Sequence, residues 1–165
     1  MELLKHSIDF AIIAILGTMG FLALLFTLER MIYLAKIKRN LAAFDSAARL
    51  EQACTNNLTT LYIIYSNAPY VGLLGTVVGI MITFYDMGKA SAIDASAIMT
   101  GLSLALYATA LGLVVAIPTL IAYNALQRKV AVLVNTYQHL APALNEAAKA
   151  QRTVNQEDAD IPAAA

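Results

Sequence analysis

The chain has 165 residues, of which 59% are hydrophobic and 13% are charged, about half the usual charged share of a soluble domain. This composition argues against an ordinary soluble domain and favours a membrane protein. The formal net charge is zero, which gives no reason to expect a nucleic-acid partner, and the single cysteine excludes an intrachain disulfide. No cluster of cysteine and histidine suggests a metal site, so we expect neither metal nor cofactor.

Residues 1–28 are predicted to form a short N-terminus and the first membrane span. The apolar run begins near Phe10 and ends at Glu29. A cleaved signal peptide is the competing interpretation. However, the run is longer than the apolar core of a typical signal peptide, and no small-x-small cleavage site precedes Glu29. We therefore expect an uncleaved membrane anchor.

Residues 29–57 mix apolar side chains with Lys, Arg and Asp, a pattern typical of an amphipathic helical hairpin partner. The second span is predicted over residues 58–85. At 1.5 Å per residue this helix is about 42 Å long, more than the hydrocarbon core of a bilayer. Its polar start is therefore expected to extend into the aqueous phase. Pro69 lies near that boundary, where a kink is tolerated.

A short loop, residues 86–94, precedes a third span predicted over residues 95–123. The segment from Ser91 to Asp94 resembles a helix start, and the Asp94 carboxylate suits the positive end of a helix dipole. Pro118 lies inside the span and predicts a bend there.

Residues 124–152 are predicted to continue the third span as an aqueous helix. The 3.5-residue apolar repeat persists beyond Tyr123 as far as Leu144, which indicates a helix held against neighbours. Those neighbours are either other parts of the same chain or other chains. Pro142 removes a helical hydrogen bond and predicts a bend. Residues 153–165 are acidic and polar and are predicted to be a disordered tail.

Lysine and arginine are unevenly distributed about the three spans. Only Lys5 and Lys89 fall on one side. The basic residues on the other side are Arg30, Lys36, Lys38, Arg39, Arg49, Arg128, Lys129, Lys149 and Arg152. The positive-inside rule therefore predicts a periplasmic N-terminus, a cytoplasmic loop at residues 29–57, a periplasmic loop at residues 86–94 and a cytoplasmic C-terminus.

The usual motifs of enzymes are missing. The glycines at 72, 75 and 79 lie within an apolar run, and no Lys-Ser or Lys-Thr pair follows them as in a Walker loop. His6 and His139 fall in different compartments on the predicted topology, so they cannot share a metal or a catalytic role. An ATP-driven pump or an intramembrane hydrolase is therefore not supported, and we expect that the chain is not an enzyme.

The second and third spans each carry a stripe of small or hydroxylic side chains at the same helical spacing. The two stripes are Gly72, Thr76, Gly79 and Thr83, and Ala105, Thr109, Gly112 and Ala116. Each stripe occupies a narrow sector of its helix, because the intervals are those of one helical face. The surrounding segments, residues 68–85 and 95–123, contain no Asp, Glu, Lys, Arg or His. Small residues in membrane helices permit close helix approach, so these stripes predict packing around something in the bilayer.

Thr76 and Thr109 are the best candidates for functional side chains. On antiparallel neighbours they would lie at similar depth, and a hydroxyl can hold a carboxylate or a water without burying a charge. The alternative is that each hydroxyl bonds only its own i−4 carbonyl. The glycines of the stripes are predicted to be close-packing positions. Asn67, near Pro69, is predicted to satisfy the backbone at the cytoplasmic mouth.

The segment from Asn67 to Asn124 resembles the ExbB/TolQ family, whose members are distant relatives of the flagellar stator protein MotA. The stretch Asn67-Ala-Pro-Tyr-Val-Gly-Leu-Leu-Gly-Thr-Val-Val-Gly-Ile is similar to the second-span signature of that family. The stretch from Gly101 to Pro118, followed by Ala122-Tyr-Asn, is similar to the third-span signature. The short cytoplasmic loop resembles that of compact ExbB members.

The resemblance implies an all-α membrane protein with three transmembrane helices and long cytoplasmic helical extensions, located in the bacterial inner membrane. Its copies would form a ring, described as a pentamer, around a single-span ExbD-type partner whose aspartate binds the proton. Proton-motive force would drive motion in that assembly, and TonB would carry the work to outer-membrane transporters. Thr76 and Thr109 would line the central pore near the partner's aspartate, with the rest of both stripes beside them.

One position departs from the family pattern. Many longer members have a glutamate five positions before the third-span threonine, where this chain has Leu104. The titrating carboxylate is therefore expected on the partner, since protonation removes its large desolvation penalty. Leu104 and the short loop favour an ExbB-type subunit over a TolQ-type subunit that serves envelope integrity. A passive membrane scaffold is a further alternative, and a self-sufficient proton channel is disfavoured by the absence of an intramembrane acid.

Overall fold

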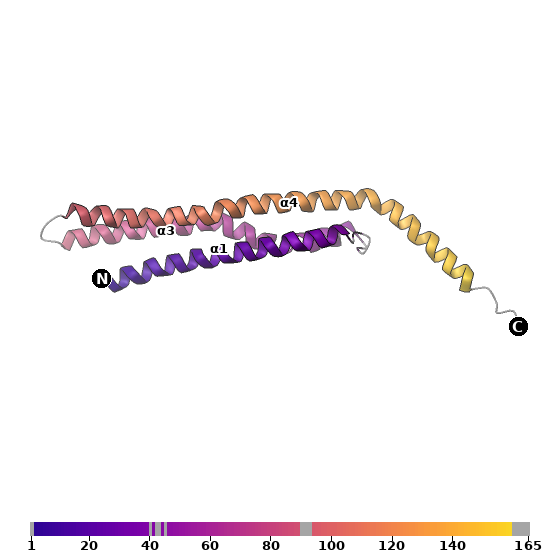
Figure 1. Cartoon of the computed structure of the whole chain (residues 1–165), viewed down its shortest axis with the longest axis horizontal. Coiled ribbons are helices and arrows are strands. Elements are labelled where there is room, and N and C mark those ends of the chain that lie inside the picture. The colour runs from indigo at the N-terminus through magenta and orange to yellow at the C-terminus, as the bar shows by residue number, and fades with distance from the viewer. Residues whose placement is uncertain (1, 40, 42–43, 45, 90–93, 160–165) are drawn as a thin grey trace. The chain divides into compact units, whose positions relative to one another are not determined.

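The computed structural model describes residues 2–39, 41, 44, 46–89 and 94–159. Within these residues the secondary structure is helical, as predicted, and no strand occurs. Figure 1 shows the helices in chain order. They are α1 (Glu2–Arg39), α2 (Ala47–Thr55), α3 (Leu58–Lys89) and α4 (Ala95–Ala159).

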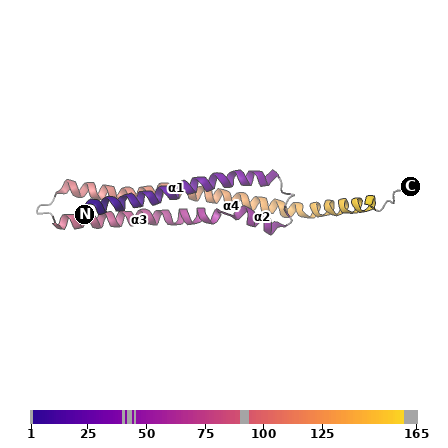
Figure 2. The same ribbon diagram turned by 90° about the horizontal axis from the view of Figure 1, so that it is seen from below.

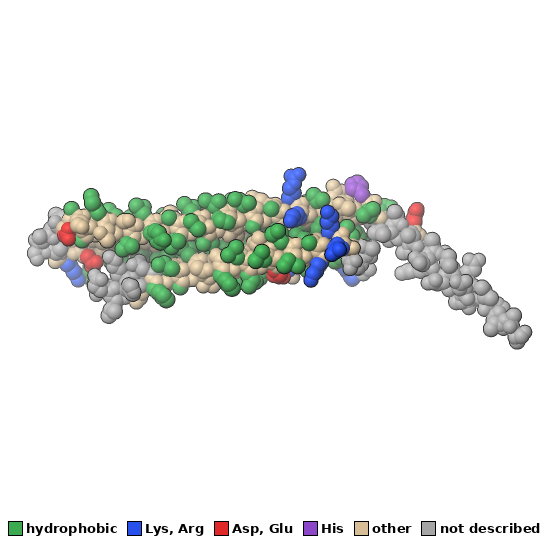
Figure 3. Space-filling view, viewed as in Figure 1, with side chains coloured by type: hydrophobic (Ala, Val, Ile, Leu, Met, Phe, Trp, Pro, Cys, Tyr) green, Lys and Arg blue, Asp and Glu red, His purple; other side chains and the backbone are tan. Residues whose placement is uncertain are grey.

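Three segments are long and apolar enough to cross a membrane. They are Phe10–Arg39, Leu58–Lys89 and Ala95–Leu140. Most of their surface is exposed in the single chain, and hydrophobic side chains cover much of the face seen in Figure 3. A large exposed apolar surface needs lipid or protein to cover it. The chain is therefore a multi-pass membrane protein, and the three predicted spans are confirmed as helices.

The helix ends follow local capping rules. Three basic residues occupy the last turn of α1, where cations interact favourably with the helix dipole. Ser46 caps α2 by accepting a hydrogen bond from the Arg49 N–H at 3.3 Å. Asn57 has a φ of 61°, the left-handed conformation common after a helix. The Asp94 carboxylate accepts from the Ser96 N–H at 2.9 Å, as expected for the start of α4, and Ser91 lies outside the described residues.

Contacts divide the chain into two compact units. The first comprises Met1–Met31 and Asn57–Leu126. Here α3 and α4 run antiparallel side by side, and α1 packs along them (Figures 1 and 2). A buried cluster of Ile12, Leu16, Ala68 and Ala116 joins all three helices. Because a membrane offers no hydrophobic driving force between helices, this close packing of small and aliphatic side chains is what holds the unit together.

The second unit comprises Ile32–Asn56 and Gln127–Ala165. Its buried apolar side chains come from α1, α2 and α4, and they are Leu34, Ile37, Leu50, Cys54, Val130, Leu133 and Tyr137. The Tyr137 hydroxyl also donates to the Phe44 carbonyl oxygen at 2.6 Å. The predicted amphipathic partner is thus α2 with the end of α1. The apolar repeat of the aqueous helix was expected to pack either on the same chain or on other chains. As far as Tyr137, the structure supports packing on the same chain.

Helix α4 extends further than the sequence predicted. It continues through Pro118 and Pro142 to Ala159, so residues 153–159 of the segment predicted to be disordered are helical. Residues 160–165 lie outside the described residues. Leu140 continues the apolar repeat but is 45% exposed.

Candidate functional site

The candidate site lies where α3 and α4 approach most closely, in the first unit. A methyl group on Gly72 would lie 2.7 Å from the Ala108 carbonyl oxygen and 3.2 Å from the Gly112 Cα. A methyl group on Gly112 would lie 2.7 Å from the Ala68 carbonyl oxygen. These neighbours are backbone atoms, which cannot move aside. The prediction that these two glycines are close-packing positions is confirmed.

This close approach brings the two threonines together. The Thr76 and Thr109 hydroxyls are hydrogen-bonded to one another across the two helices. Thr76 Oγ1 also lies 3.0 Å from the Ala105 carbonyl oxygen of α4 and 3.3 Å from the Gly72 carbonyl oxygen of its own helix. Thr109 Oγ1 lies 3.4 Å from the same Gly72 oxygen. The prediction that both threonines lie at similar depth is therefore confirmed.

Thr76 and Thr109 make more hydrogen bonds than the single bond to the i−4 carbonyl that is common for threonines in membrane helices. Thr76 does reach its i−4 carbonyl, as the simpler interpretation required. The bonds of Thr109 go instead to α3, so the pair links two helices rather than capping its own. Both side chains are partly exposed. Each hydroxyl has one proton and two lone pairs, so acceptor capacity is left over for a molecule outside the chain.

The other stripe residues are buried to different degrees. Thr83 is buried, and its hydroxyl donates to the Gly79 carbonyl oxygen of its own helix at 2.9 Å. Ala105 packs against Gly79, and a methyl group added to Gly79 would lie 2.8 Å from the Ala105 Cβ. Ala116 belongs to the buried cluster of the first unit. Within the single chain, Thr76, Thr109 and Gly79 are the stripe residues that are not fully buried.

The predicted mouth residues lie at the polar end of α3. Asn67 is exposed and donates to the Ile63 carbonyl oxygen at 2.8 Å, the backbone role that the sequence suggested. Pro69 sits inside α3 without ending it. Neither residue contacts the threonine pair through a hydrogen bond in the described structure.

Sequence reasoning missed an aromatic cluster near this mouth. The rings of Tyr62, Tyr65 and Tyr123 meet with centroid distances of 5.4, 6.0 and 5.2 Å. Such tilted and edge-on contacts are favourable beyond the burial of area. The signal was present in the spacing, because Tyr65 precedes Gly72 by two turns and Tyr123 follows Ala116 by two turns. The cluster therefore continues both stripes with large residues.

The site can form hydrogen bonds, but it has no titratable group of its own. Residues 68–85 and 95–123 contain no Asp, Glu, Lys, Arg or His. Among the described residues, no group of three His, Cys, Asp or Glu side chains is placed to hold a metal ion. The threonine pair therefore offers hydroxyl and carbonyl oxygens, but no carboxyl, amine or imidazole group.

Comparison with known proteins identifies relatives that match most of the chain. The profile of the MotA/TolQ/ExbB proton channel family matches residues 34–139, which include both threonines. A biopolymer transport protein ExbB of Helicobacter pylori is 59% identical over 133 residues, covering 81% of this chain and 90% of that protein. An ExbB of Aquifex aeolicus is 49% identical over 130 residues, covering 79% and 86%. The Tol-Pal system protein TolQ of Pseudomonas aeruginosa is 37% identical over 94 residues, covering 57% and 41%.

Proposed function

Because the chain belongs to the MotA/TolQ/ExbB proton channel family, we propose that it is an ExbB-type subunit of a motor driven by proton-motive force. Membership confirms the family predicted from the two span signatures, and a proton channel family agrees with the prediction that the chain is not an enzyme. The proposed location is the bacterial inner membrane. The proposed assembly is a ring of copies, a pentamer, around an ExbD-type single-span partner, with TonB receiving the work.

The threonine pair is the observation that carries this proposal. Thr76 and Thr109 present two hydroxyls side by side in spans without charge. Their protons are taken up by one another and by the carbonyl oxygens of Gly72 and Ala105. A protonated carboxyl on a partner helix can therefore donate to a threonine oxygen without breaking these bonds.

The ionised form of the same carboxyl meets a different situation. It needs a donor, so one hydroxyl must turn away from a backbone carbonyl, and the charge must leave water. The pair thus favours the protonated partner and disfavours the ionised one. We infer that proton binding from the periplasm lets the partner pass the pair and that proton loss to the cytoplasm makes the step one-way.

The proposed orientation has a periplasmic N-terminus and a cytoplasmic C-terminus. The exposed basic side chains Lys36, Lys38, Arg128 and Lys129 support it, since the positive-inside rule assigns such clusters to the cytoplasm. The site residues Asn67 and Pro69 would then mark the cytoplasmic mouth.

An ExbB role is favoured over a TolQ role. The Helicobacter pylori ExbB matches along 90% of its length, whereas the Pseudomonas aeruginosa TolQ matches along 41%. Leu104, at the position where many longer members have glutamate, supports the same choice. We expect the chain to restore TonB-dependent uptake in a strain that lacks ExbB. We expect it not to restore detergent resistance in a strain that lacks TolQ.

The test of the proposal removes both hydroxyls and keeps the shape of the side chains. We expect Thr76→Val with Thr109→Val to abolish energised uptake of a TonB-dependent iron chelate, while the protein still co-purifies with its partner. Thr76→Ser with Thr109→Ser should retain uptake. Thr100→Val is the matched control, because the exposed Thr100 hydroxyl bonds the Ser96 carbonyl of its own helix and no other group of the described residues. Full uptake by the double valine variant would support a passive scaffold instead.

A further inference from the structure

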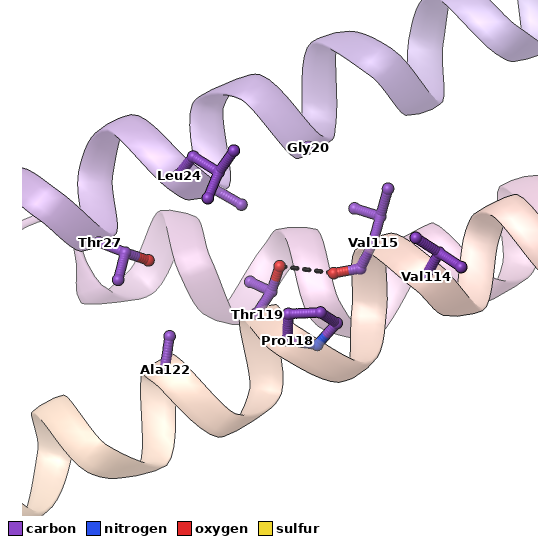
Figure 4. Close-up of a pocket in the computed structure, with 9 residues that line it drawn as sticks. Gly20, Leu24, Thr27, Val114, Val115, Pro118, Thr119 and Ala122 are labelled. Carbon is purple, nitrogen blue, oxygen red and sulfur yellow. Dashed lines mark hydrogen bonds between the residues drawn. The ribbon is translucent and has the colours of Figure 1, made fainter.

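A second feature of the first unit is a groove between α1 and α4, away from the threonine pair. Figure 4 shows it in close-up, with α1 and α4 contributing the two sides. Its volume is about 310 Å³. The residues that line it are Gly20, Ala23, Leu24, Thr27, Val114, Val115, Pro118, Thr119 and Ala122. Six of the eight side chains are apolar, and the other two belong to Thr27 and Thr119.

The floor of the groove is made of small or buried residues. Ala23 and Thr119 are buried, and Gly20 has no side chain. Leu24 and Val114 line it as well but are each 66% exposed, so they stand above that floor. A helix with its side chains is about 10 Å across and would rest on such walls. A single hydrocarbon chain can reach the floor.

The length of the groove along α1 fits within one leaflet of a bilayer. From Gly20 to Thr27 the helix rises about 10 Å at 1.5 Å per residue, and half of a hydrocarbon core is about 15 Å. One end lies near Thr27 and Ala122, next to Glu29 and Tyr123 at the polar boundary. The proposed orientation makes this the cytoplasmic leaflet.

The polar end of the groove carries the Thr27 hydroxyl, which donates no hydrogen bond within the described residues. Thr18, Thr83 and Thr119 each donate to the carbonyl of the residue four positions earlier in their own helix. The Thr27 hydroxyl has no such bond and no other partner among the described residues. In Figure 4 it points from α1 towards the side where Thr119 lies. A hydroxyl at this depth gains from an acceptor supplied by a ligand.

From these observations we propose that the groove binds one acyl chain of a phospholipid from the adjacent leaflet. The methylene chain lies along the floor between Ala23 and Thr119. The ester carbonyl oxygen, which joins that chain to glycerol at the polar boundary, accepts the hydrogen bond from Thr27. The bound lipid fills the space between α1 and α4, the helix that carries Thr109, and fixes the distance between these two helices.

The test uses the full chain in nanodiscs that contain phosphatidylglycerol with a photoactivatable diazirine in its acyl chain. Labelled positions are mapped by mass spectrometry. We expect adducts to concentrate on the groove residues. Ala23→Leu, which fills the floor, should reduce that labelling several-fold. Thr27→Val keeps the shape, and should reduce labelling about threefold, the factor that an average hydrogen bond in a membrane supplies.

Thr18→Val is the matched control, since it removes a hydroxyl of the same helix that is already bonded to the Ala14 carbonyl. It should leave groove labelling unchanged. Labelling spread evenly over the exposed faces, or labelling that both Ala23→Leu and Thr27→Val leave intact, would overturn the proposal. So would efficient chain-to-chain crosslinking from a benzophenone attached at Leu24→Cys, because it would assign the groove to a second copy.

Discussion

At the residue scale, the function proposed for this chain depends on two glycines as much as on two threonines. Gly72 and Gly112 bring the backbones of α3 and α4 into contact. The hydroxyls of Thr76 and Thr109 meet only because of that contact. A side chain at either glycine would separate the helices and break the pair. Close packing and hydrogen bonding are therefore coupled at this site.

We predict that Gly72→Ala destabilises the protein by about 1–3 kcal/mol, the range for overpacking at a tight contact. The added methyl group would lie 2.7 Å from the Ala108 carbonyl oxygen, which belongs to the backbone. Gly88→Ala is the control, because nothing lies within 4 Å of the added methyl group. Thermal unfolding in detergent should show a lower Tm for Gly72→Ala and an equal or higher one for Gly88→Ala. Equal Tm values for the two variants would mean that the helices are not in contact at Gly72.

Individual site residues could be predicted from sequence where the spacing was regular. The interval between Gly72 and Thr76, repeated in the third span, predicted that both threonines lie on the facing sides of two helices. The role of Thr27 could not be predicted in this way, because it depends on which face of α1 is turned towards α4. That rotation is decided by packing of Ile12 and Leu16 in the buried cluster, and no local pattern encodes it.

At the element scale, α4 is long enough to include both the third membrane span and its aqueous extension. The span and its extension form one helix, Ala95–Ala159. Along it the residues on the packed face change from small ones to Val130, Leu133 and Tyr137, which are buried. In water, apolar burial supplies the stability that close backbone packing supplies in lipid.

We predict that Tyr137→Phe lowers the stability of the second unit by about 1 kcal/mol, the usual net value of one buried hydrogen bond. The variant keeps the ring in place and removes the bond from the Tyr137 hydroxyl to the Phe44 carbonyl oxygen. Hydrogen exchange should become faster in α2 and in the last turns of α1. Tyr107→Phe, at a side chain that is 61% exposed, should have no effect. Unchanged exchange in α2 for Tyr137→Phe would show that this bond contributes nothing.

The spans were easier to predict than the helix ends. Hydropathy located the three apolar segments, because a membrane imposes a minimum length on each. It did not show that α1 begins at Glu2 or that α4 reaches Ala159. Residues 153–159 combine the good helix formers Gln156, Glu157 and Ala159 with the weaker ones Thr, Val, Asn and Asp, so their composition does not decide between helix and disorder.

At the scale of the whole molecule, the two ends of the spans differ in charge, and this difference makes the proposed topology testable. In a background with Cys54→Ala, a membrane-impermeant maleimide added to spheroplasts should label Lys89→Cys. It should label Arg128→Cys only after the membrane is permeabilised. The reverse pattern would invert the topology and with it the direction of proton movement.

The assembly is the part that neither composition nor spacing could specify. Much of the apolar surface of the three spans is exposed in one chain, and it is covered either by lipid or by other copies. The sequence and the single chain are equally compatible with different ring sizes. The proposal of a ring rests on the resemblance of the two span signatures to the ExbB/TolQ family, and not on the exposed faces of the single chain.

The most direct measurement is of proton flux into liposomes. The central claim is that this chain supplies an uncharged, hydroxyl-lined path and that the titrating carboxyl comes from a partner. The purified chain alone should pass few protons, and adding a single-span partner with a membrane aspartate should raise the flux. An Asp→Asn change in the partner, or Thr76→Val with Thr109→Val in this chain, should abolish that increase. Strong flux through the chain alone, unaffected by the valine substitutions, would contradict the account.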